Sequence, residues 1–388
     1  MAQFEWDVDA SGQKKPRPGP AKLVFMRPGV PGAPMTLVDP DSRVFHKAAC
    51  WRASDGSTRV LTIGGTEAVM KLWRWEAGAW HADELYRGAF GGKWNRLRDV
   101  EVGDVDGDGA SELIVATHDQ GVVLVGKRDG DRWRFDEIDR KAETFVHEIE
   151  LGDADKDGIV EIFATPSEPN RARASTHGSL VRYQWDTKAK RFVRSVVATL
   201  EGSHAKEILT ADLAGDGAVE LYAAVEAELK PEDGELAVSR PVEVRRYGYA
   251  KGRFVASTVA TLPDALQARV LIAASLTQPR DGKSASAGPP RGQELIVTTM
   301  KDGVWRIRPP ALPGAPWMQT QLTDESSGFE HAAGVADTDG DGQSELYVFG
   351  DDQDELARHH WNGTSFSRKV IGSFDKSDIV WSIEGCAP

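Results

Sequence analysis

Short apolar runs that begin with Glu recur along the chain. The runs ELIVAT, EIFAT, ELYAA and ELYVF begin at Glu112, Glu161, Glu220 and Glu345. β-Branched and aromatic residues in runs of about four to eight positions, bounded by turn signals, predict β-strands. AKLVFMRPG and PMTLVDPD predict outer strands near the start of the chain. No apolar run reaches the ~18 residues that a membrane-spanning helix needs, so the pattern predicts an all-β protein without a membrane span.

Each of the four runs follows an Asp-rich loop. The loops read DVDGDG, DADKDG, DLAGDG and DTDGDG, and the complete copies have the pattern D-x-D-x-D-G-x-x-E. Oxygen ligands at alternating positions can surround a hard cation, and the Gly permits the sharp turn. The sequence therefore predicts structural calcium at three loops: Asp104, Asp106, Asp108 and Glu112; Asp153, Asp155, Asp157 and Glu161; and Asp337, Asp339, Asp341 and Glu345.

The fourth loop is degenerate. Its acidic positions are Asp212, Asp216 and Glu220, but Ala214 occupies the third position of the pattern. We expect this loop to bind calcium weakly or not at all, because one oxygen ligand is lost.

The spacing of the loops predicts the fold. Their first Asp residues lie 49, 59 and 125 residues apart, which is the scale of propeller blades, with one further blade in the long gap. Extending the repeat to both ends predicts a seven-bladed β-propeller of four-stranded antiparallel blades, formed by residues 1–388 as one domain. Residues 1–45 and 375–388 are expected to close the last blade. The remaining blades are predicted at 46–97, 98–146, 147–205, 206–268, 269–330 and 331–374.

The repeated DxDxDG loop followed by E-[LI]-[IFY] resembles the FG-GAP/VCBS class of calcium-loop β-propellers. The resemblance covers roughly residues 46–388 and departs from the pattern in blades one, five and seven, where the loop is lost. It implies the fold, whereas the class includes adhesion modules, lectin-like binders and carbohydrate lyases or dehydratases. Propellers similar to those of aldos-2-ulose dehydratase offer a catalytic analogy only.

Charge and cysteine content indicate which partners and which cellular compartment to expect. The net charge of −13 argues against nucleic acid as a partner. Cys50 and Cys386 are the two cysteines, and they are expected on neighbouring innermost strands. One closing disulfide is compatible with that placement, but two thiols in a reducing compartment are favoured. The polar N-terminus, which lacks a signal peptide, predicts a cytoplasmic protein, with secretion as the alternative if the sequence was trimmed.

A ring of ionisable residues is predicted at the channel mouth opposite the calcium loops. Each ring residue lies on an innermost strand, six residues before the first position of the loop that follows that strand. The ring consists of His46, Arg98, His147, Lys206, Arg269, His331 and Val380, and the next positions inward are Lys47, Asp99, Glu148, Glu207, Val270, Ala332 and Trp381. Charged side chains are rarely buried unless they are paired or bind a ligand.

His46, His147 and His331 fall in blades one, three and six, nearly evenly around the ring. Three imidazoles with an open coordination position would form a catalytic-type site for a transition metal such as zinc, with manganese, iron or copper as alternatives. His204 could replace one ligand. The competing interpretation is that these histidines only bind channel water and neighbouring strands.

The other ring residues predict substrate contacts. Arg98, Lys206 and Arg269 would clamp a carboxylate, phosphate or polyhydroxylated ligand, or else form salt bridges with the inner carboxylates. Glu148 or Glu207 would serve as the base. The second-to-third-strand turns lie at the same face and carry, among others, His118 and Glu226.

These features favour a metal-dependent lyase, dehydratase or isomerase acting on a small, oxygen-rich, sugar-like or anionic substrate. The alternative is a propeller that binds a glycan or a protein without turnover. A third possibility is a natural-product tailoring or cyclisation enzyme using the same pocket. The partner is thus expected to be a small molecule, and the oligomeric state is open.

Overall fold

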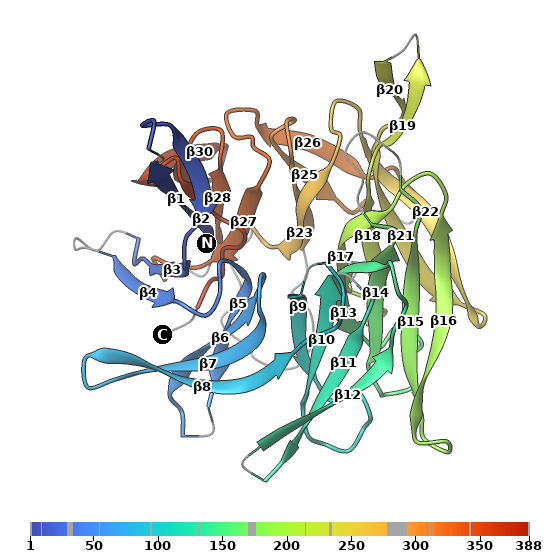
Figure 1. Ribbon diagram of the computed structural model, residues 1–388. Coiled ribbons are helices and arrows are strands. Elements are labelled where there is room, and N and C mark those ends of the chain that lie inside the picture. Colours follow the sequence, from blue (N-terminus) through green and yellow to red (C-terminus); the bar gives the residue numbers. More distant parts are fainter. Residues whose placement is uncertain are drawn as a thin grey trace.

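The computed structural model describes residues 2–386, except 9, 29–33, 54, 94, 119, 131, 170–175, 214, 233–234, 278–292, 311, 313 and 341–342. Within these residues the chain forms strands and turns, and none of them forms a helix that could span a membrane. Six four-stranded antiparallel sheets are arranged around a centre as the blades of a β-propeller (Figure 1).

The strands of the blades follow one another along the chain. Blade one has β5 (Phe45–Arg52), β6 (Thr58–Gly64), β7 (Ala68–Glu76) and β8 (Ala79–Gly88). Blade two has β9 (Arg96–Gly103), β10 (Glu112–His118), β11 (Val123–Asp129) and β12 (Arg132–Asp139). Blade three has β13 (Phe145–Gly152), β14 (Glu161–Ser167), β15 (Gly178–Asp186) and β16 (Arg191–Leu200).

Blade four has β17 (Ala205–Ala211), β18 (Glu220–Val225), β21 (Val242–Ala250) and β22 (Arg253–Leu262), with the separate hairpin β19 (Glu228–Glu232) and β20 (Glu235–Arg240) inserted between β18 and β21. Blade five has β23 (Ala268–Ala274), β24 (Glu294–Thr299), β25 (Val304–Arg308) and β26 (Met318–Thr323). Blade six has β27 (His331–Ala336), β28 (Glu345–Gly350), β29 (Glu355–Trp361) and β30 (Phe366–Ser373).

The apolar runs of the sequence are the second strands of the blades. The side chains of β10, β14, β18, β24 and β28 are almost entirely buried, because neighbouring blades pack on both faces of these strands. The fourth strands β12 and β16 are largely exposed at the rim. Burial on both faces requires continuous apolar runs rather than alternation, which explains the pattern that predicted these strands.

The prediction of seven four-stranded blades is wrong, since the described residues form six. In place of a seventh blade the terminal segments form two small sheets. One contains β2 (Lys14–Pro18), β1 (Ala2–Val8) and β31 (Asp378–Ile379), and the other is the hairpin β3 (Ala21–Phe25) and β4 (Met35–Asp39). Pro lacks the amide donor of a strand ladder, and Pro16, Pro18 and Pro20 interrupt the donors that a regular blade would need.

The C-terminal residues 380–386, here called the strap, lie between blades six and one. A Cβ on Gly334 of β27 would lie 2.5 Å from the carbonyl oxygen of Ile383, so the strap passes directly against β27. Cys386 forms a disulfide with Cys50 of β5, with the two Cα atoms 5.8 Å apart. The expectation of two thiols is therefore corrected. The repeat spacing placed the strap properly, but the segment joins β5 and β27 without forming a regular strand.

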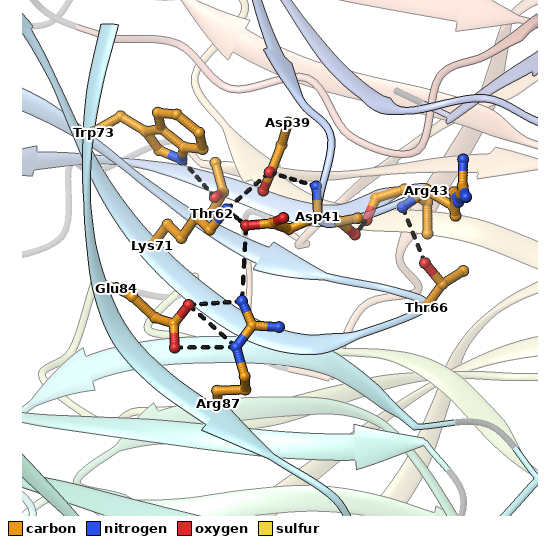
Figure 2. A network of polar contacts seen from close by, with 11 residues as sticks. Asp39, Asp41, Arg43, Thr62, Thr66, Lys71, Trp73, Glu84 and Arg87 are labelled. Atoms are coloured by element: carbon orange, nitrogen blue, oxygen red, sulfur yellow. Dashed lines mark hydrogen bonds and ion pairs between the residues drawn. The ribbon is translucent and has the colours of Figure 1, made fainter.

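A buried ion pair fixes the β3–β4 hairpin to blade one (Figure 2). The ammonium group of Lys71 donates to Asp39 Oδ1 at 2.8 Å and to Asp41 Oδ2 at 2.7 Å, and the side chains of Lys71 and Asp39 are 7% and 1% exposed. Burial alone would lower the pKa of Lys71, but the bonds with the two carboxylates raise it overall. The hairpin thus depends on one lysine of the third strand of blade one.

Replacing Lys71 with Met is expected to destabilise the protein by about 3–5 kcal/mol, because Asp39 is left as a buried, unpaired charge. Chemical denaturation with a two-state fit measures the loss. The double variant Lys71→Met/Asp39→Asn is the matched control and should recover part of the loss. A double variant no more stable than Lys71→Met would contradict the assigned role of Asp39.

Candidate functional site

The first strand of each blade carries the predicted ring, and five of its residues lie in β-bulges. His46, Arg98, His147, Lys206 and Arg269 all fall at register shifts, where the first strand carries an extra residue relative to the second. A bulge turns a side chain out of the regular ladder and is common beside binding sites. In contrast, His331 pairs regularly with Gly350.

The Asp-rich loops and the ring lie at opposite ends of the first strands. About six residues of strand, at roughly 3.3 Å each, separate the two and give a distance of about 20 Å. The inner ring, defined here as His46, Arg98, His147, Lys206, Arg269 and His331, therefore lies on the face away from the loops.

The structure does not bring the three predicted metal-binding histidines together. Both ring nitrogens of His331 have protein partners: Nδ1 donates to the carbonyl oxygen of Thr299 at 2.8 Å, and Nε2 is 2.8 Å from the hydroxyl of Ser326. Because Arg98 can only donate, Nδ1 of His46 must accept its hydrogen bond at 2.6 Å, which leaves the ring proton on Nε2. A metal-bound imidazole needs the opposite arrangement, with its second nitrogen donating to an acceptor.

Other histidines gather around His147 instead. Its ring centroid lies 5.5 Å from that of His118 and 5.5 Å from that of His204, and its Nε2 is 3.2 Å from the hydroxyl of Ser167. Burial lowers the pKa of His118 to about 2 and that of His204 to about 3, and it lowers the pKa of His147 well below the usual value. These rings are therefore neutral at physiological pH.

The cations of the ring and the buried carboxyl groups near them influence one another between blades. Burial raises the pKa of Glu207 on β17 to about 8, although the positive charges of Arg98 and Arg269 act to lower it. Since these two arginines belong to β9 and β23, groups from three blades converge. Glu330 is also buried and has a raised pKa, and its carboxylate lies 4.0 Å from the guanidinium of Arg269.

Glu226, which follows β18, has comparable properties. Burial raises its pKa to about 7 against the charges of Lys206 and Arg269. Burial also lowers the pKa of Lys206, whose ammonium group donates to Gln267 at 3.1 Å. From the sequence, Glu226 was expected only as one of the turn residues. The feature that could have indicated its role is its position directly after the buried second strand β18.

The carboxylate of Glu148, the predicted base, forms a hydrogen bond with the neighbouring blade. It accepts the backbone N–H of Ile208 on the next blade at 2.5 Å, as Asp99 accepts that of Ile149 at 2.9 Å. Asp99 also binds Lys47 at 2.8 Å, so part of this inner layer is an ion-pair network. Glu148 therefore links blades three and four, which leaves Glu207 and Glu226 as the better candidates for proton transfer.

Two of the Asp-rich loops each bring three of their four predicted ligands together. Asp104, Asp106 and Asp108 have carboxylate oxygens within 4.8 Å of one another, as do Asp153, Asp155 and Glu161. In these loops the first Asp accepts backbone N–H bonds from within the loop, for example from Gly107, Gly109 and Gly158. These glycines have φ of +71° to +90°, a conformation that favours Gly.

The remaining predicted ligands are placed as follows. Asp339 and Glu345 group with His360, which the sequence analysis missed, whereas Asp341 lies outside the described residues. Glu112 and Asp157 are not part of the carboxylate groups of their loops. Glu112 accepts a hydrogen bond from the backbone N–H of Val105, and Asp157 accepts one from that of Ile159. In the degenerate loop, Asp212 accepts the N–H groups of Gly215 and Gly217, Asp216 that of Ala218, and Glu220 contacts Arg246.

A basic residue of the third strand reaches the second-strand Glu in five blades. The pairs are Lys127–Glu112, Arg182–Glu161, Arg246–Glu220, Arg306–Glu294 and Arg358–Glu345. The pairs of blades four and five form although one loop is degenerate and the other is absent. The cation thus balances the buried carboxylate in each of these blades, and it would have to share that carboxylate with a bound calcium ion.

Comparison with known proteins supports the β-propeller fold. The chain is similar to a protein from Lactobacillus plantarum (TM-score 0.53, 12% identity, 95% of this chain and 90% of that one). It is also similar to a candidate 6-phosphogluconolactonase from Bacteroides fragilis (0.52, 13%, 88% and 88%). A third similar structure is an Agrocybe aegerita lectin that recognises non-reducing terminal N-acetylglucosamine (0.50, 15%, 84% and 80%). At these identities the similarity defines the fold alone.

No family model matches the chain, and no curated protein matches it significantly. The fold defines the protein as a β-propeller with four-stranded antiparallel blades. The resemblance to FG-GAP/VCBS repeats remains a prediction from the sequence.

The buried histidines predict how stability depends on pH. Burial lowers the pKa of both His331 and His359 to about 4, below the ordinary value of 6.5. Below pH 6.5 each of these two histidines takes up a proton in the unfolded chain before it does so in the folded one, and therefore destabilises the protein as pH decreases toward 4. The buried carboxyl groups with raised pKa, such as Glu207 and Glu226, act in the opposite direction, so the contribution of a histidine is measured as a difference between wild type and variant. Between pH 6.5 and 4 the melting temperature of His359→Gln should change less unfavourably than that of the wild type, and an identical pH dependence would argue against this role of His359.

Proposed function

We propose that the inner ring, together with the buried carboxyl groups of Glu207 and Glu226, forms the acid–base site of an enzyme that acts on a small, oxygen-rich, anionic substrate such as a sugar acid or keto-sugar. The observation that carries the proposal is the convergence of bulged residues from several blades on buried carboxyl groups with pKa values near neutrality. Groups with such pKa values are suited to proton transfer at physiological pH.

The pKa values suggest the roles of the two carboxyl groups. Between pH 7 and 8, Glu226 is mostly ionised and Glu207 mostly protonated. Glu226 is therefore the proposed base and Glu207 the proposed acid, which differs from the role first expected for Glu207.

Dehydration illustrates the proposed chemistry. Glu226 takes the proton next to the substrate carbonyl, the C–O bond at the neighbouring carbon breaks, and Glu207 donates its proton to the departing hydroxyl, which leaves as water. An isomerase would use the same pair to move a proton between two carbons. Arg98 and Arg269 would hold the substrate carboxylate, and Lys206 would bind a neighbouring oxygen.

Solvent-deuterium incorporation tests this function. Uronic acids, aldonic acids and keto-sugar acids are incubated with the protein in deuterated buffer, and exchange next to the carbonyl is followed by proton NMR. We expect exchange or loss of water with at least one member, and a loss of at least about 100-fold in Glu226→Gln, within the range for removing a general base. Glu168→Gln, which changes an exposed carboxylate outside the pair, is the matched control.

The pH dependence of kcat/KM should be bell-shaped. The kcat/KM for the active substrate rises through pH 7 as the base ionises and falls above pH 8 as the acid loses its proton. Glu226→Gln should lose the acidic limb, and Glu207→Gln the alkaline limb. Saturable binding of these compounds without any exchange would overturn the enzyme proposal in favour of a glycan-binding propeller.

We also propose that the loops of blades two, three and six hold structural calcium. The grouping of their carboxylates supports this, and a cation that binds only the folded protein stabilises it. Millimolar calcium should raise the melting temperature of protein treated with chelator. Asp153→Asn/Asp155→Asn should reduce the shift, whereas Asp216→Asn in the degenerate loop should not. Equal shifts in both variants would contradict the assignment.

A further inference from the structure

An apolar cavity of about 270 Å³ lies at the place where a seventh blade would stand. Its walls come from the β3–β4 hairpin, from blades one and six and from the strap. Along β3, Leu23 and Phe25 pack with blade one, whereas Val24 packs with blade six. Strand β3 therefore contacts both neighbouring blades, whereas β4 leaves Met35 and Val38 exposed. Two strands and an irregular strap do not fill the space of a four-stranded blade.

The lining is mainly aromatic and aliphatic. Phe25 contributes from the hairpin, Phe349, Leu356 and Phe374 from the side of blade six, and Ile383 from the strap. The strap is held in place by the Cys50–Cys386 disulfide, and both cysteines also border the cavity. Apolar walls offer water few hydrogen bonds, and an engineered apolar cavity of about 150 Å³ binds benzene.

We infer that this cavity is a binding site for a compact, planar apolar molecule, about the size of a bicyclic aromatic ring. The volume is larger than a benzene site but too small for a strand of peptide. Phe349 and Phe374 already meet edge to face at 5.3 Å, which is the geometry in which aromatic rings attract. The site is separate from the inner ring, so it would bind a ligand other than the proposed substrate.

Isothermal titration calorimetry with indole tests the inference, and purine serves as a polar molecule of the same size. We expect indole to bind saturably at one site, and purine to bind at least about 10-fold more weakly. Val24→Phe places a larger side chain among the apolar residues that line the cavity and should weaken indole binding at least about 10-fold. Val102→Phe is the matched control: it makes the same change at a partly exposed valine of blade two, outside the cavity, and should bind indole like the wild type.

Further controls distinguish a loss of binding from a loss of folding, and a small-molecule ligand from a second copy of the chain. Far-UV circular dichroism establishes that each variant is folded, and Ile383→Phe, which fills the cavity from the strap, provides a second variant should Val24→Phe fail to fold. Absent indole binding by the wild type, equal binding by the filled variant, or equal binding of purine would overturn the inference. A wild-type dimer that Val24→Phe dissociates would also overturn it, since a second copy of the chain would then be the occupant.

Discussion

The ring of blades depends on how its two ends are joined. Sheets that surround an axis hold together only if the first and last blades are bridged, because an open ring exposes apolar faces and strand edges to water. Here the bridge is not a regular blade. It consists of the strap between β27 and β5, the disulfide from Cys386 to Cys50, and the β3–β4 hairpin that Lys71 fixes to blade one. Residues separated by almost the whole sequence therefore maintain the geometry of the inner ring.

The fold could be predicted well wherever the sequence repeats. The Glu-led apolar runs are buried second strands, and the Asp-rich loops mark the turns before them. The count of blades failed at the termini, where there is no repeat to compare. Whether Ala21–Phe25 and residues 380–386 complete a four-stranded blade depends on long-range packing and on the amide donors that Pro removes. Neither is visible as a period in the sequence.

The candidate site could be predicted only in part, because equal repeat positions do not guarantee equal orientations. Arg98, Lys206 and Arg269 each lie in a bulge of their own blade, and all three act to lower the pKa of Glu330, which burial raises. In contrast, His331 lies in a regular ladder, and its two ring nitrogens contact Thr299 and Ser326. Glu226 was underrated because it lies beyond the end of a strand. Burial decides its pKa, and burial depends on neighbours from other blades.

The bulges have a consequence for how such a site can change. A bulged residue has no partner across the ladder, so replacing its side chain leaves the pairing of the blade intact. The scaffold thus separates positions that maintain the sheets from positions that line the proposed site. Related chains could differ at His46, Arg98, His147, Lys206 and Arg269 without a cost to their blades, and a library confined to these five positions would vary recognition while it preserves the fold.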